Sequence, residues 1–240
     1  MSPDVVIAVA GLFVALGGFV QSGIGLGLGL IGAPIVTLLA PALMPGSMLV
    51  ATAALPMLIL AREALHTDWP GVSWALGGRV AGTVGGVWVL AVMSLRALGI
   101  AVGAMVLAVV ALSIREAAVP RTRATLVTAG VISGVAGTAT SISGPPVALL
   151  YQDESGPRVR ATLSAYFIVG NSIALAALAL SGRLPARDVV AGLVFVGCAT
   201  AGFAVAAGLR RFLDAGRTKI AVLASAAGSA LVLIVHSVLG

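Results

Sequence analysis

The 240-residue chain has few charged residues and a single cysteine, and each shortage excludes a class of protein. Asp, Glu, Lys and Arg together make up 9% of the residues, whereas an average soluble domain has about 25%. The lone Cys198 allows no disulfide framework and no cysteine-based metal motif. We therefore expect neither a soluble domain nor a disulfide-stapled one, and we expect no metal and no cofactor.

Acidic residues are missing from the positions where a membrane carrier would hold a coupling proton. All eight lie at the ends of apolar runs or between them. Intramembrane carboxylates mark proton relays in pumps and transporters. Proton coupling in this chain would therefore have to use the substrate itself, a histidine or water.

What the chain has in abundance is apolar sequence. Hydrophobic residues make up 60% of it, and the mean hydropathy is +1.14. The basic residues, which give a net charge of +6, are mostly scattered over short loops between apolar runs. The expected partner is therefore the lipid bilayer and not nucleic acid. The runs, several of them near the ~20 residues that cross a bilayer, are 5–43, 47–61, 71–95, 97–114, 124–151, 161–182, 189–209 and 220–239.

A glycine-rich segment occurs twice. GFVQSGIGLGLGLIGAP at 18–34 returns 112 residues later as GVISGVAGTATSISGPP at 130–146. This offset aligns Gly18 with Gly130, Gly25 with Gly137, Gly32 with Gly144 and Pro34 with Pro146, and Ala51-Thr52 is matched by Ala161-Thr162 at an offset of 110. Broken apolar segments at corresponding positions of two repeats are typical of the binding sites of secondary transporters.

The positions of the basic residues indicate how the broken segments 5–43 and 124–151 cross the membrane. If each crosses once, six basic residues lie on one side and seven on the other. If each returns to the side it left, ten share a side against Arg96, Arg183 and Arg187. The second arrangement follows the positive-inside rule. Residues 124–151 are also too few for two crossings of about 20 residues each, which favours a re-entrant hairpin.

The predicted fold is an all-α polytopic membrane protein with two inverted repeats, each a re-entrant (broken) helical hairpin followed by three transmembrane helices. Because three spans are an odd number, the second repeat is inverted and both termini lie outside. Repeat 1 covers 1–116, with a hairpin at 5–43 and spans at about 47–65, 70–95 and 97–115. A cytoplasmic linker at 117–123 precedes repeat 2 at 124–240, with a hairpin at 124–151 and spans at about 160–182, 187–209 and 219–239.

The two hairpin tips are expected to meet near the midplane and to form an anion site. Each returning arm starts a helix at its tip, and a helix N-terminus has partial positive charge and unpaired N–H donors. Gln21 and Ser22 lie near the first tip. The predicted substrate-binding residues at the breaks are Gly25, Gly27, Gly29, Gly32, Pro34, Gly137, Thr138, Thr140, Ser141, Ser143, Gly144 and Pro145.

Five further residues are candidates for substrate contact. Arg79 lies about ten residues into the run 71–95, and a charge inside the membrane usually lines a substrate path. Alternatively, the Arg79 side chain snorkels to the membrane interface or binds a backbone carbonyl exposed at a hairpin break. Tyr166 and Asn171 share one span, and their polar groups alternatively satisfy broken helix ends. Thr52 and Thr162 recur between the repeats but alternatively bond their own helices. Gly78, Gly82 and Gly86 are interpreted as helix-packing residues.

These features resemble the TauE/SafE sulfite exporter family. The resemblance rests on Gly32-Ala33-Pro34, Gly144-Pro145-Pro146, Arg160-Ala161-Thr162-Leu163, Tyr166-Phe167, and on Ala51-Thr52 with His66 and Trp69 further on. The family usually has adjacent glycines where this chain has Gly25-Leu26-Gly27-Leu28-Gly29, and often glycine at Ser141 and Ser143. The resemblance implies transport of sulfite, an organosulfonate or another small anion across a bacterial inner membrane. The oligomeric state stays open, a homodimer among the alternatives.

Three other functions fit parts of the pattern. An anion channel shares every feature above and differs in showing no saturation of flux at low concentration. An intramembrane serine hydrolase would use Ser141-Ile142-Ser143-Gly144, but a serine nucleophile needs a base within hydrogen-bond reach. The two histidines, His66 and His236, fall near span ends on opposite faces, so we do not expect an enzyme. A purely structural membrane subunit would bind no ligand.

Overall fold

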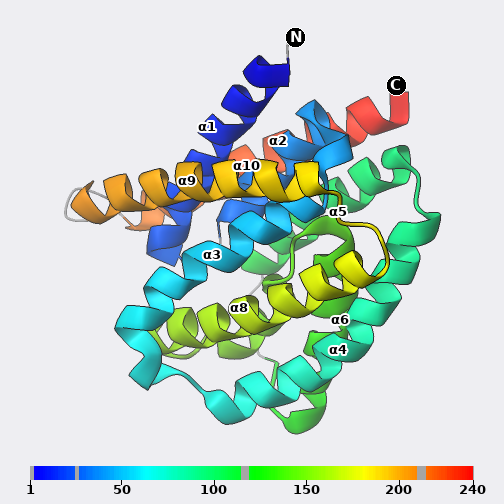
Figure 1. The fold of residues 1–240 in the computed structure, drawn as a ribbon. Coiled ribbons are helices and arrows are strands. Elements are labelled where there is room, and N and C mark those ends of the chain that lie inside the picture. The colour runs from blue at the N-terminus through cyan, green and yellow to red at the C-terminus, as the bar shows by residue number, and fades with distance from the viewer. Residues whose placement is uncertain (1–2, 25–26, 115–118, 210–214, 240) are drawn as a thin grey trace.

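The computed structural model describes residues 3–24, 27–114, 119–209 and 215–239, and the regular elements within these ranges are all helical (Figure 1). Six of the described helices are long and apolar enough to cross a membrane, which confirms an all-α polytopic membrane protein. The elements are α1 (Pro3–Ile24), α2 (Leu28–Leu39), η1 (Pro41–Leu43), α3 (Gly46–Glu63), η2 (Ala64–His66), α4 (Trp69–Val92), α5 (Leu95–Ile114), α6 (Arg123–Thr140), α7 (Pro145–Ala148), η3 (Leu149–Tyr151), α8 (Gly156–Leu180), α9 (Ala186–Leu209) and α10 (Ala215–Leu239).

Local signals decide where several helices begin and end. The Asp68 side chain accepts a hydrogen bond from the Gly71 N–H and caps the start of α4. Thr122 and Thr125 form a reciprocal capping box that starts α6. At its other end α6 stops because Ser141 adopts the left-handed conformation, with φ of 64°. The bounds of α3, α4, α5, α8, α9 and α10 lie within about one helical turn of the six expected spans. The helices long and apolar enough to cross a membrane are the first five of these together with α1, whereas the apolar part of α10 described by the structure, Leu223–Leu239, is shorter.

The two broken segments differ in the lengths of their arms. In the first, α1 has 22 residues and itself qualifies as a membrane span, while the returning α2 has 12. In the second, α6 has 18 residues, and the returning arm is the four-residue α7 followed by the three-residue η3. Arg121, before α6, and Glu154, after η3, form an ion pair at 2.6 Å. The second segment therefore returns to the face of the fold that it leaves.

Helices of the two halves interleave through close backbone contacts. α4 packs along α6, α1 along α9, α3 along α8 and α5 along α10. A methyl group added at Gly78 or Gly82 would lie 2.1 Å from the Val127 carbonyl oxygen or 2.2 Å from that of Val131. At Gly86 it would lie 2.8 Å from Cβ of Thr138. These contacts confirm the packing role predicted for the three glycines on α4.

Buried apolar residues form two main clusters, and the second break lies where they meet. The larger joins α1, α2, α3, α5, α9 and α10 and includes Ile142. The smaller joins α4, α6, α7, η3 and α8 and includes Phe167. Ile142 and Phe167 also face a common cavity, so this boundary is where the candidate site lies.

Candidate functional site

The two helix breaks line one small cavity of about 40 Å³. A water molecule needs roughly 10–15 Å³ on the same measure, so the cavity holds a few waters or one small ion. The described residues that line it carry no formal charge and combine backbone, hydroxyl and amide groups with apolar side chains. They are Gln21, Gly27, Gly29, Leu30, Thr52, Ser141, Ile142, Ser143, Gly144, Pro145, Phe167 and Asn171.

At the first break, the N-terminus of α2 presents backbone donors to the cavity. The Leu28 N–H donates to Oε1 of Gln21 at 3.1 Å, and the first bond of the helix runs from Ile31 N–H to Gly27 O. Helix geometry leaves the N–H groups of Gly29 and Leu30 without an intrahelical partner. Both residues line the cavity. The partial positive charge of a helix N-terminus favours an anion beside these donors.

The second break offers hydroxyls in place of a helix end. We expected the N–H groups of a helix N-terminus at this break as well. The structure differs, because α7 has four residues and starts with Pro145 and Pro146, which have no N–H to donate. Ser141 instead turns the chain: its N–H donates to Gly137 O at 2.8 Å and its hydroxyl to Pro45 O at 2.9 Å. Ser143 lies on the cavity wall, and its carbonyl oxygen accepts from the Ser133 hydroxyl.

Asn171 connects the cavity to the buried Arg79. Nη2 of Arg79 donates to Oδ1 of Asn171 at 2.7 Å, and Nδ2 of Asn171 donates to Oγ1 of Thr52 at 3.1 Å. The Thr52 hydroxyl donates in turn to Met48 O at 2.7 Å. Because Arg79 is a donor only, it fixes the Asn171 amide with its oxygen toward the guanidinium and its NH2 group toward Thr52.

Two glycines make room for the Arg79 side chain, which is fully buried. A methyl group at Gly170 would lie 2.2 Å from Arg79 Nε, and one at Gly137 would lie 3.4 Å from Nη2 and 2.4 Å from Cβ of Ser143. The guanidinium carbon lies 5.0 Å from the centre of the Tyr166 ring, a cation–π distance. Arg79 therefore lies directly behind the cavity wall without lining it.

Eight of the residues predicted from sequence to bind substrate line this cavity. They are Gly27, Gly29, Thr52, Ser141, Ser143, Gly144, Pro145 and Asn171. Arg79, Gly137 and Tyr166 form the layer behind it. Gly25 lies outside the described residues.

Five predicted residues do not line this cavity. Gly32 packs against Met48, and Pro34 is buried inside α2. Thr138 packs at the α4–α6 contact, beside Gly86. The Thr140 hydroxyl donates to Ala136 O at 2.7 Å, and that of Thr162 accepts from the Asp68 N–H at 3.0 Å.

Sequence reasoning missed several residues of the site. Leu30 and Ile142 line the cavity and align with each other at the offset of 112. Gln21, noted near the first tip but left out of the predicted binding set, aligns with Ser133, whose hydroxyl accepts from Arg79 Nη1 and donates to Ser143 O. The alignment of the two segments could therefore have identified both pairs as candidate site residues. Phe167 and Gly170 lie outside the repeated segment, so it gave no signal for them.

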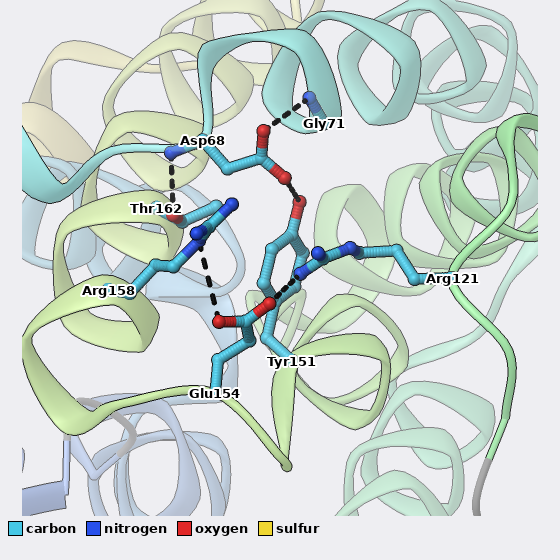
Figure 2. A network of polar contacts seen from close by, with 7 residues as sticks. All are labelled: Asp68, Gly71, Arg121, Tyr151, Glu154, Arg158 and Thr162. Carbon is cyan, nitrogen blue, oxygen red and sulfur yellow. Dashed lines mark hydrogen bonds and ion pairs between the residues drawn. The ribbon is translucent and has the colours of Figure 1, made fainter.

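A polar network joins the two halves, with residues from the start of α4, the segment before α6, η3 and the segment after it, and the start of α8 (Figure 2). The Tyr151 hydroxyl donates to Oδ2 of Asp68 at 2.9 Å, and Glu154 pairs with Arg121 and with Arg158. Burial, and then the bond to Asp68, raise the pKa of the Tyr151 phenol above its usual range, so the phenol remains a donor. Nearby, Arg160 binds Glu63 through two hydrogen bonds of 2.6 and 3.1 Å.

Comparison with known proteins identifies a family. The sequence model of the family described as Sulfite exporter TauE/SafE matches residues 10–233, nearly the whole chain. No curated protein and no solved structure matches the chain significantly.

Proposed function

Because the chain belongs to the TauE/SafE sulfite exporter family, we propose that it carries a small sulfur oxyanion, sulfite or an organosulfonate, across a bacterial inner membrane through the cavity between its helix breaks. The family comprises membrane transporters of sulfur anions and not enzymes. The serine hydrolase alternative is therefore set aside.

The observation that carries the proposal is the set of donors around the cavity. The unprotonated oxygens of sulfite, hydrogen sulfite or a sulfonate accept hydrogen bonds, and the residues of the wall supply donors: the N–H groups of Gly29 and Leu30, the Ser143 hydroxyl and the Asn171 amide. Arg79 adds a full positive charge one layer behind. Neutral donors with a nearby buried cation favour an anion of this size over a cation or an apolar ligand.

The helix pairs support an internal repeat and transport by alternating access. If α1 corresponds to α6 and α4 to α9, the α1–α9 contact and the α4–α6 contact exchange with each other. The contacts α3–α8 and α5–α10 then each map onto themselves. Rocking of one inverted repeat against the other around a central site is the usual mechanism for such an arrangement.

Flux measurements test the proposed function and separate a carrier from a channel. Purified protein in proteoliposomes is expected to exchange labelled sulfite or methanesulfonate against unlabelled anion inside, with a rate that saturates. A non-saturating flux that does not depend on internal anion would support the channel alternative. Absence of flux for every sulfur oxyanion and sulfonate tested would contradict transport.

The proposed topology places 62–68, 115–123, 152–160 and 210–219 in the cytoplasm and the α8–α9 loop outside. Residues 115–118 and 210–214 lie outside the described residues. The Arg160–Glu63 and Arg121–Glu154 pairs, which bring the first three loops together, support this. In a Cys198→Ala background, an impermeant thiol reagent added to spheroplasts is expected to label a cysteine replacing the exposed Arg183. It is expected to leave one replacing the exposed Asp153 unlabelled. The reverse pattern would invert the orientation.

In alternating access, the network of Figure 2 would hold the cytoplasmic side closed, because Asp68 belongs to repeat 1 and Tyr151 to repeat 2. A hydrogen bond to a charged group is worth about 1.5–3 kcal/mol. The reporter is an Ile142→Cys, Cys198→Ala protein in inside-out vesicles, to which an impermeant thiol reagent is added from outside. Adding Tyr151→Phe is therefore expected to raise the labelling rate about tenfold or more.

A matched control for this experiment is Thr128→Ala, which removes an exposed hydroxyl that bonds Ala124 O of its own helix. It is expected to leave the labelling rate unchanged. Equal rates with Tyr151 and with phenylalanine at this position would show that the network does not control access.

A further inference from the structure

The charge of Arg79 has no carboxylate partner among the residues that the structure describes. The side chain is fully buried, and its contacts are the neutral Ser133 hydroxyl at 3.3 Å, the Asn171 amide at 2.7 Å and the Tyr166 ring. Nε has no recorded partner in the same part of the chain. Asp68, the acidic residue at the start of α4, is 11 residues away, about 16 Å along the helix.

Other charged groups on the neighbouring helices lie near one end of the fold. α4 packs against α6 and α8, and α8 also packs against α3. Apart from Arg79, the charged residues of these four helices are Arg62 and Glu63 at the end of α3, Arg123 at the start of α6, and Arg158 and Arg160 at the start of α8. Tyr166 is the one titratable side chain recorded against Arg79 in the described residues.

A buried, unpaired guanidinium is strongly unfavourable, and arginine cannot relieve this by losing its proton. The described residues of the neighbouring cavity wall carry no formal charge. One negative charge in the cavity would balance the positive charge of Arg79, from which it is separated by the Asn171 amide. A dianion would neutralise it and leave one unpaired negative charge in the same interior, which is again unfavourable.

Resting on the proposed function, we infer that the cavity selects the singly charged form of a sulfur oxyanion, hydrogen sulfite or a monosulfonate, over the sulfite or sulfate dianion. Arg79 is the specificity-determining residue. It acts from behind the wall through Asn171, whose amide it orients, and through Ser133, which also bonds Ser143. The number of charges accepted is thus set by the single buried cation.

Binding to the purified wild-type protein tests this inference directly. Methanesulfonate is a fixed monoanion and sulfate a dianion, and sulfite changes between the two forms near neutral pH. We expect methanesulfonate to bind independently of pH and sulfate to bind at least about tenfold more weakly. Sulfite affinity is expected to fall as the pH rises through the loss of its second proton.

Variants of Arg79 separate charge selection from a merely structural role. Arg79→Gln is expected to lose about tenfold or more in methanesulfonate affinity and to lose the preference over sulfate. Arg79→Lys keeps the charge without the planar fork, so it is expected to bind more weakly yet to keep the preference. Loss of the preference with lysine, or its persistence with glutamine, would overturn the role of Arg79.

The outcomes also separate this inference from the proposed function. Equal binding of methanesulfonate and sulfate, or sulfite affinity that rises with pH, would overturn the charge selection while leaving sulfur oxyanion transport intact. Failure of all three probes to bind the folded wild-type protein would overturn both.

Discussion

Replacing Ser143 with leucine is expected to abolish transport without unfolding the protein. Ser143 lies on the wall of a cavity of about 40 Å³. Its Cβ lies against Gly137, so a longer side chain has to extend away from α6 and toward the open space. Leucine would fill that space and remove the hydroxyl donor. Proteoliposome flux and direct anion binding measure the loss, and thermal unfolding in detergent checks the fold.

Ser172→Leu is the matched control for this variant. Ser172 is an exposed residue of α8 whose hydroxyl donates to Ile168 O of its own helix, and leucine is well tolerated on a lipid-facing helix. It is expected to transport like the wild type. Ser143→Gly is expected to keep transport with a changed substrate preference, because it removes one donor and widens the cavity. Wild-type flux in Ser143→Leu would remove this cavity from the transport path.

Replacing Gly170 with alanine is expected to reduce anion affinity by at least about tenfold. The new methyl group would lie 2.2 Å from Nε and 2.5 Å from Cδ of Arg79, so the guanidinium has to move. This movement breaks the 2.7 Å bond to Asn171. A hydrogen bond to a charged group is worth about 1.5–3 kcal/mol, which corresponds to a loss of about tenfold or more.

Gly77→Ala provides the control, since no atom lies within 4 Å of a methyl group added there. Gly77 is on α4, the helix that carries Arg79, and is exposed. The control is expected to bind and transport normally. Wild-type affinity in a folded Gly170→Ala protein would show that the position of Arg79 does not affect the anion.

The membrane-spanning helices were predictable because hydropathy and length are properties of the local sequence. A span must be apolar over about 20 residues whatever it packs against, so α3, α4, α5, α8 and α9 were located to within about a helical turn. The breaks were also predictable, because glycine and proline act on the backbone locally. The offset of 112 linked the two breaks, and both line the same cavity.

The arms of the broken segments were harder to predict. Glycine inside α1 does not end that helix, because membrane helices tolerate glycine, and the helix continues to Ile24. Two successive prolines at the start of α7 remove the N–H donors on which a second helix-end anion site would depend. The two broken runs therefore produced arms of different lengths and two chemically different breaks.

The sequence by itself determined that the chain is a helical membrane protein and where its two breaks lie, since both depend on composition, periodicity or local backbone chemistry. Its motifs also resembled the family whose model matches the chain. Only the tertiary structure decided which polar groups face the cavity. Thr52 and Thr162 occupy matching positions in the repeats, yet Thr52 accepts from Asn171 at the cavity and Thr162 accepts from the Asp68 N–H in the network. Arg79 likewise depends on room left by Gly170 and on an acceptor 92 residues away. A side chain takes its hydrogen-bond partner from whichever helix packs beside it, and that neighbour is a property of the assembled fold.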